Sequence, residues 1–264
     1  MKLILSKPSL NNVLFFVLSI SSLMFYSCSG NDVKDKDDLK IKSVKKLPFE
    51  KRFKREIESK LQIPVNEKYT YKIYKDFLNL DDVKDAVITV NRLDFALNEA
   101  SRSENTAQIA EAGYTGNYNF FFYYDGKTDQ ISNPIAVASS PQVPLEVKLE
   151  NIQSEFFKDI TITYHIRNSA FKNYYLMMNG NIQLMFQWKL FDAIGTTNPE
   201  ANYLEYEKGS YNEFKDIVIY KGKIKNYSPL VKDIYNYNPL IEKDGVKLYR
   251  FFFDKRTLKY STND

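Results

Sequence analysis

From residue 69 onward the chain consists mainly of short segments in which β-branched or aromatic residues alternate with polar ones. In the clearest of them, Ile160, Ile162, Tyr164 and Ile166 alternate with Thr161, Thr163, His165 and Arg167. A period of two is that of a β-strand and places the two sets on opposite faces. We therefore expect an antiparallel β fold in which one face of this strand is buried and the other, carrying His165, faces water.

The same criteria predict further strands and the turns between them. Asn168-Ser169-Ala170 and Asn179-Gly180 separate consecutive apolar runs, and Asn-Gly is a strong hairpin signal. Two segments, 93–112 and 195–201, are expected to leave the sheet, the first with a helical part at 106–112. Besides 160–167 and the strands on either side of 76–85, the expected strands are 118–124, 131–138, 145–149, 171–178, 182–191, 216–220, 246–253 and 257–261.

These patterns predict a mainly β protein, a β-rich α+β fold whose antiparallel sheets form a sandwich or an irregular propeller-like arrangement. Residues 65–264 are expected to form the globular part, either as one domain or as two closely packed halves. A short amphipathic helix over 48–64 should precede it, with Pro48 in the first turn and Pro64 ending it. Its apolar stripe consists of Phe49, Phe53, Ile57 and Leu61. The stripe either packs on the edge of the domain or docks on a membrane or partner protein.

The N-terminus has the parts of a bacterial secretory signal. Lys2 and Lys7 form a cationic region, an apolar run covers 13–26, and Ser27 is a small residue at the cleavage position. The run is shorter than the about 20 apolar residues that cross a bilayer, so we expect a signal peptide over 1–27 rather than a spanning helix. Residues 28–47 follow as a charged segment without hydrophobic period, expected to be a disordered tether.

Cys28 is the single cysteine of the chain and stands directly after the apolar run. The stretch Phe25-Tyr26-Ser27-Cys28 resembles the lipobox of Gram-negative bacterial lipoproteins. This resemblance implies that cleavage exposes Cys28, that the residue is acylated with fatty chains such as palmitate, and that it anchors the protein to a membrane. In these lipoproteins an aspartate directly after the cysteine is the signal for retention in the inner membrane. Ser29 stands at that position, so the resemblance implies the outer membrane. The aspartates of 32–38 resemble the acidic export tags of surface lipoproteins, and both the periplasmic face and the cell surface stay open.

The distribution of charge along the chain indicates which partners it can attract. The formal charge of +4 includes Lys2 and Lys7, so the chain from Cys28 onward carries +2 (4 − 2). Residues 40–60 hold nine basic and three acidic residues, a balance of +6 beside the expected anchor. This collar should be attracted to membrane phosphates. We expect no nucleic-acid partner, because an exported protein does not meet nucleic acid and the globular part is slightly acidic.

A short motif, Lys-Asp preceded by an apolar residue and followed by a strand, occurs three times. The spacings between Lys84, Lys158 and Lys215 are 74 and 57 residues (84 to 158, 158 to 215), too unequal for a regular propeller or solenoid. An aspartate at the start of a strand can accept hydrogen bonds from turn amides, and this role is the expected one.

The segment 76–85 between two expected strands carries more acidic residues than the other copies. It resembles the aspartate-rich calcium loop of FG-GAP and VCBS repeats. The resemblance implies calcium as a cofactor, with Asn79, Asp81 and Asp85 as ligands and Asp76 close to the first ligand position; Asp82 stands where the family has a glycine. Calcium favours six to eight oxygen ligands, which a tight loop can supply. The alternative is a loop that keeps its shape without an ion.

The sequence offers little catalytic machinery. His165 is the single histidine, and the sequence contains no G-x-S-x-G, H-E-x-x-H, phosphate-binding or dinucleotide motif. Aromatic clusters such as 120–124 put neighbouring rings on opposite strand faces, where outward tyrosines can stack on sugars or contact a partner. We expect a non-enzymatic, lipid-anchored envelope protein that binds a partner protein, glycan or envelope component. The alternative is a polysaccharide hydrolase with paired carboxylates.

Overall fold

The computed structural model describes residues 48–104, 116–178, 181–194, 196, 198–225 and 238–263. The chain divides into two compact units, 1–56 and 57–264. The expected signal peptide, Cys28 and the tether to residue 47 lie outside the described residues. Of the helices within the described ranges, none combines the length and the apolar composition that crossing a bilayer requires.

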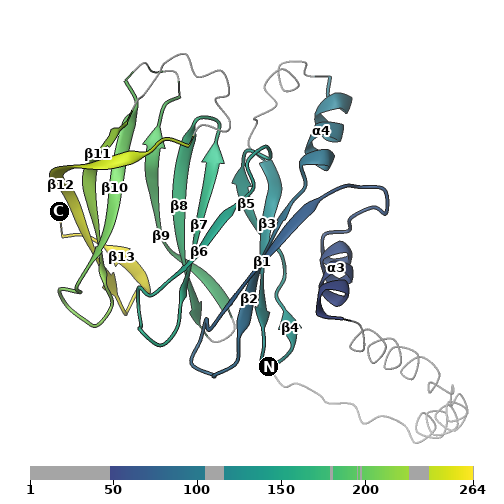
Figure 1. Cartoon of the computed structure of the whole chain (residues 1–264), viewed down its shortest axis with the longest axis horizontal. Helices are drawn as coiled ribbons and strands as arrows, with labels where there is room; N and C mark the ends of the chain where they lie inside the picture. Colours follow the sequence, from purple (N-terminus) through teal and green to yellow (C-terminus); the bar gives the residue numbers. More distant parts are fainter. Residues whose placement is uncertain are drawn as a thin grey trace, which may run out of the picture. The chain divides into compact units, whose positions relative to one another are not determined.

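The described strands form two antiparallel sheets (Figure 1). One is five-stranded, in the order β1-β2-β3-β4 with β5 paired to β3, and the other is eight-stranded, from β13 to β6 in reverse sequence order. The first contains β1 (Thr70–Asp76), β2 (Asp85–Asn91), β3 (Gly116–Asp125), β4 (Gln130–Ile131) and β5 (Ile135–Ser139). The second contains β6 (Glu146–Glu150), β7 (Asp159–Ile166), β8 (Ser169–Met178), β9 (Asn181–Asp192), β10 (Glu200–Glu207), β11 (Asp216–Ile224), β12 (Ile241–Asp254) and β13 (Lys259–Ser261).

The predicted mainly β, antiparallel fold is confirmed, and most expected strands are present with shifted ends. The segment 131–138 is divided into β4 and β5, and Pro134 lies between them. The expected turn Asn179-Gly180 lies outside the described residues, but β8 and β9 pair around it with Met178 opposite Asn181. The prediction failed at β10 (Glu200–Glu207). Residues 195–201 were expected to leave the sheet, and no strand was predicted over the residues that follow. The residues of β10 alternate Tyr203 and Glu205 with Leu204 and Tyr206, a weaker period than that of β7.

Two helices lie within the described residues. α3 (Phe49–Lys60) corresponds to the expected helix at 48–64, and Ile57 and Leu61 of its stripe are buried, as the packing interpretation requires. α4 (Leu93–Arg102) follows β2 and buries Ala96 and Ala100. The helical part expected at 106–112 lies outside the described residues.

A first hydrophobic core lies between the two sheets. Val87 and Phe121 of the five-stranded sheet pack in the same cluster as Ile160, Ile162 and Tyr175 of the eight-stranded sheet. These residues alternate along their strands, so each sheet contributes one apolar face. Two antiparallel sheets with a shared core correspond to the sandwich among the arrangements expected from sequence.

A second core covers the opposite face of the eight-stranded sheet. Tyr174 of β8 and Phe186 of β9 cluster with residues of β11, β12 and β13, and the rings of Phe186 and Tyr260 lie 5.7 Å apart. β9 and β13 are four positions apart in the sheet, which would separate them by about 19 Å if the sheet were flat. The sheet therefore curls until its C-terminal strands cover β8 and β9.

This curl corrects one prediction. His165 was expected to face water, but it is only 6% exposed, and Thr161 on the same strand is also buried. Because β7 has protein on both of its faces, the alternation of polar and apolar residues does not separate a solvent-exposed face from a buried one here. The His165 ring lies edge-on to Phe191 at 6.0 Å.

Three hairpins are built alike: β1–β2, β6–β7 and β10–β11. Their loops, 77–84, 151–158 and 208–215, have equal length and end in lysine. In each hairpin an acidic residue that ends the first strand pairs with an aspartate that begins the second: Asp76 with Asp85, Glu150 with Asp159, Glu207 with Asp216. The three Lys-Asp motifs seen in the sequence thus occupy equivalent places. The aspartates are buried and accept hydrogen bonds from backbone amides, as predicted.

Candidate metal centre

The loop between β1 and β2 is shaped by its own polar side chains. Oδ1 of Asn79 accepts a hydrogen bond from the Asp81 amide (2.8 Å), and Oδ1 of Asp81 accepts one from the Val83 amide (3.0 Å). Asp82 has a φ of 60°, the left-handed conformation that glycine adopts at no cost. Aspartate tolerates this region better than most residues, so the sharp turn persists without glycine.

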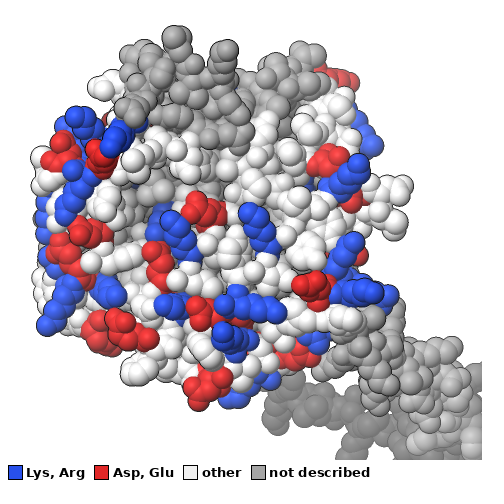
Figure 2. Space-filling view, in the orientation of Figure 1, with Lys and Arg blue, Asp and Glu red and all other residues white. Residues whose placement is uncertain are grey.

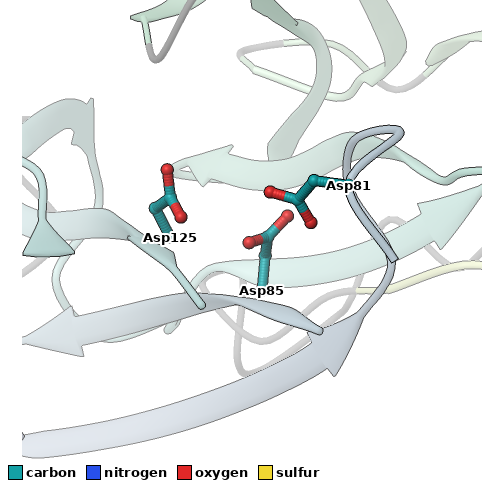
Figure 3. A group of neighbouring side chains, drawn as sticks. All are labelled: Asp81, Asp85 and Asp125. Atoms are coloured by element: carbon teal, nitrogen blue, oxygen red, sulfur yellow. The ribbon is translucent and has the colours of Figure 1, made fainter. Parts of the chain in front are cut away.

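Three carboxylates converge beside this loop. Asp81 comes from the loop, Asp85 from the first position of β2, and Asp125 from the end of β3 (Figure 3). One carboxylate oxygen of each lies within 4.8 Å of the others. Three like charges at this separation repel one another unless a proton or a cation offsets them.

A glycine brings the third carboxylate to the other two. A Cβ atom at Gly126 would lie 2.2 Å from the carbonyl oxygen of Lys84, so only glycine lets the turn after β3 approach the β1–β2 loop this closely. The Gly126 amide donates to Oδ1 of Asp85 at 2.9 Å. Oδ1 of Asp125 in turn accepts from the amides of Lys127 and Thr128 (2.9 and 2.8 Å).

Asp85 is the buried member of the group. Asp85 is 0% exposed, and its Oδ2 has no hydrogen-bond partner among the described residues. Burial raises the pKa of Asp85, the Gly126 amide and the nearby Tyr123 hydroxyl lower it by less, and the charges of Asp81 and Asp125 raise it further. A buried anionic oxygen without a partner is costly, and a bound cation is one way to remove that cost.

The structure brings together part of the predicted ligand set. Asp81 and Asp85 meet as the resemblance implied. Asp76 is outside the group and its Oδ1 accepts from the Phe77 amide (2.9 Å), while Asn79 uses Oδ1 for the loop and donates to the Tyr123 hydroxyl (3.3 Å). Asp125 was missed, because it lies 40 residues from Asp85 in sequence (125 − 85). The one signal for it was the Asp-Gly pair that ends an apolar strand.

The three equivalent hairpins differ in how they satisfy the strand-initial aspartate. Asp159 accepts from the Ile152 and Gln153 amides (3.1 and 2.8 Å) and from the Gln153 side chain. Asp216 accepts from Nε of Arg250 at 2.7 Å and from the Ser210 amide at 3.1 Å.

Within the described residues, only the third hairpin has a cationic side chain next to this aspartate. Arg250 also pairs with Glu207 (2.8 Å), and these carboxylates, with Asp216 first, raise its pKa. Asp85 has instead two further carboxylates and an unpartnered oxygen. The first hairpin therefore holds its strand-initial aspartate without a cationic side chain beside it in the described chain.

Oxygen ligands of this kind suit a hard divalent cation. Asp81, Asp85 and Asp125 could each supply one carboxylate oxygen, and water or backbone carbonyls would complete a shell. His165 contributes nothing here: burial lowers its pKa, so it stays neutral at physiological pH, and it packs against Phe191.

The domain also contains an open cleft of about 870 Å³, lined by β9, β10, β11 and β12 together with Phe171 of β8. Trp188 and Tyr249 form an aromatic wall, and Glu200 is the only carboxylate among its described lining residues. On the face in Figure 2, basic and acidic side chains are interspersed. No protein-family model, curated protein or solved structure matches the chain.

Proposed function

We propose that this protein is a lipid-anchored envelope protein whose β domain binds calcium between two loops and acts by binding rather than by catalysis. The observation that carries the calcium part is the buried, unpartnered Oδ2 of Asp85 beside Asp81 and Asp125. Calcium is favoured over magnesium because the donors come from two separate loops, and calcium accepts irregular, expanded coordination.

Calcium binding is tested by isothermal titration calorimetry of the chelator-treated protein with CaCl₂ and MgCl₂. We expect a saturable signal with calcium at a Kd of about 0.1–1 mM, the range of extracellular calcium modules. Asp125→Asn should weaken binding at least tenfold. Asp254→Asn is the matched control, because Asp254 ends β12 before a turn of equal length and its Oδ1 likewise accepts an amide, from Arg256. Equal binding by both variants would contradict the proposal.

The anchor is proposed from Cys28 and the apolar run before it. Two or more acyl chains anchor a protein stably to a bilayer, whereas one gives only marginal, reversible binding. Labelling of growing Gram-negative cells with a clickable palmitate should mark the wild-type protein, and Cys28→Ala should lose the label and leave the membrane fraction. Protease treatment of intact cells then separates the cell surface from the periplasmic face. An unlabelled wild type contradicts the anchor but leaves calcium binding untouched.

The described lining of the aromatic cleft supports binding over hydrolysis. Glycoside hydrolysis uses two carboxylates about 5 to 10 Å apart beside the bound sugar. Glu200 has no second carboxylate among the described lining residues of that cleft. The binding partner is therefore proposed to be a protein, glycan or envelope component that leaves unchanged.

A further inference from the structure

The cleft exists because two neighbouring strands of the curled sheet diverge. β9 and β10 pair at Glu200 with Asp192 and at Ala201 with Phe191, the first positions of β10, after which the described part of β10 pairs with β11 alone. Asn202 bridges the diverging edges by donating to the Lys189 carbonyl at 3.0 Å. The resulting volume is in the range of pockets that hold one small ligand or a short oligomer.

The aromatic wall of the cleft is rigid on one side and exposed on the other. Trp188 stacks on Phe186 (5.9 Å, 3° between planes) and lies 5.2 Å from Phe251, so its indole is fixed by the second core. Tyr249 meets Trp188 at 5.5 Å and 62° and is itself 41% exposed. The indole Nε1 is buried and has no acceptor among the described residues. Fixed rings offer a flat apolar surface at low entropic cost, which suits the C–H face of a sugar ring.

The charges of the cleft favour an anionic ligand. Lys189 is neutralised by Asp192 at 2.7 Å, but Lys221 and Lys223, both exposed, form no ion pair in the described part of the chain. Glu200 is the single carboxylate against them in the described lining. These two exposed ammonium groups lie on one wall of the cleft, where the carboxylates of a uronic acid could form ion pairs with them and an uncharged sugar could not.

We propose that this cleft binds an acidic oligosaccharide containing uronic acids, with sugar faces on Tyr249 and Trp188 and carboxylates at Lys221 and Lys223. The inference deepens the proposed binding function by naming its ligand class. It needs neither the metal centre nor the anchor, and both are measured separately. Charge complementarity and the aromatic wall carry it.

The test is calorimetric titration of the full-length protein in detergent with hexagalacturonate, the oligomer of six galacturonic acids. A chelator is present, because uronates themselves bind calcium. Maltohexaose serves as the neutral sugar and hexaglutamate as an anionic peptide of the same length. We expect hexagalacturonate to bind, with an affinity that falls as salt rises, and the two other hexamers to bind at least tenfold more weakly.

The variants locate the binding in the cleft. Tyr249→Ala should weaken it by about fivefold or more, the equivalent of roughly 1 kcal/mol for an aromatic contact. The double variant Lys221→Gln, Lys223→Gln should weaken it further and flatten the salt dependence. Tyr211→Ala, at a tyrosine 67% exposed, and Lys259→Gln, at an exposed lysine, both lie outside the lining; they are the controls and should bind as the wild type does.

Three results would overturn the inference: no binding of hexagalacturonate at millimolar concentration, equal binding of maltohexaose or hexaglutamate, or unchanged affinity in the cleft variants. Thermal unfolding of each variant checks its fold. Should Tyr249→Ala fail to fold, the double lysine variant decides, because both of its sites are exposed. Calcium binding by the same samples distinguishes loss of the cleft function from loss of the metal centre.

Discussion

Calcium should stabilise the folded domain through Asp85, and Asp85→Asn should abolish that effect. The substitution keeps an oxygen that can accept from the Gly126 amide but removes the negative charge beside Asp81 and Asp125. Without calcium the variant should be at least as stable as the wild type, because a neutral amide replaces a buried, unpartnered anion. With calcium the wild type should gain stability and the variant should not.

The size of the effect follows from mass action. At a calcium concentration of about one hundred times Kd, a ligand that binds only the folded state contributes about 2.7 kcal/mol. For a domain of about 200 residues, each kcal/mol moves Tm by about 2–4 °C. With 10 mM CaCl₂ and a Kd of about 0.1 mM, the wild type should melt about 5–10 °C higher than in chelator.

The effect should also depend on pH with a definite sign. Burial raises the pKa of Asp85 above its ordinary value of 3.8, so between the two values the native protein holds a proton that the unfolded chain has released. The stability of the calcium-free protein therefore falls as pH rises through that range. Calcium favours the charged carboxylate, so its effect on Tm should be small at low pH and reach full size above the native pKa.

Differential scanning fluorimetry with CaCl₂, MgCl₂ or chelator measures the calcium-dependent shift in Tm, its loss in Asp85→Asn and its dependence on pH. Asp254→Asn again serves as control, because it removes a charge from an equivalent turn that has no neighbouring carboxylate cluster in the described chain. Retention of the calcium shift by Asp85→Asn, or no shift in the wild type at 10 mM calcium, would refute the reasoning.

Two further substitutions test the other hairpins. Burial raises the pKa of Asp159 from 3.8 to about 6. Relative to Asp159→Asn, the wild type should lose about 3 kcal/mol of stability as pH rises from below 4 to 7, which urea unfolding at both limits would reveal; a pH-independent difference would contradict this. Arg250→Leu should destabilise by about 3 kcal/mol, because the Asp216 carboxylate stays buried without its cation; urea unfolding showing a loss under 1 kcal/mol would argue against that pair.

Strands could be predicted from sequence where local preference and burial agree. Ile160 and Ile162 are apolar at every second position and are buried in the structure, so a period of two suffices to locate β7. The exposure of His165 could not be predicted in this way. Its environment is set by the curl of the sheet, which brings Phe191 and residues of β10, β11 and β12 into one cluster beside it. The recurrence of Lys-Asp was visible, but its unequal spacing hid the equal loops that the structure reveals.

The same distinction applies to the candidate metal centre: a local motif identifies two of its residues, and the third depends on how the strands pair. Asp81 and Asp85 lie within one loop and its following strand, so a local motif identifies them. Asp125 arrives through the pairing of β2 with β3, which brings the turn after β3 beside the β1–β2 loop. Gly126 makes the close approach possible. A single sequence contains the Asp-Gly pair but not the information that this turn meets that loop.

The equivalence of the hairpins leads to a last prediction: an arginine introduced beside the first hairpin at the position that corresponds to Arg250 should pair with Asp85. Arg250 pairs with Val218, two residues after Asp216, and Tyr123 pairs with Val87, two residues after Asp85. Tyr123 therefore holds the position from which Arg250 reaches its aspartate. Tyr123→Arg should place a guanidinium beside Asp85 and make calcium unnecessary.

The expected phenotype is a folded protein whose Tm does not rise with calcium; its Tm in chelator also includes the cost of losing the Tyr123 ring, which is 3% exposed and packs in the core between the sheets. Tyr123→Phe is the control, since it removes the hydroxyl but no charge and should keep the calcium response. One outcome would contradict the equivalence: an arginine variant that folds but still gains about 5 °C with calcium. That outcome would mean that the Asp85 site differs from the Asp216 site in backbone geometry, and not only in the origin of its cation.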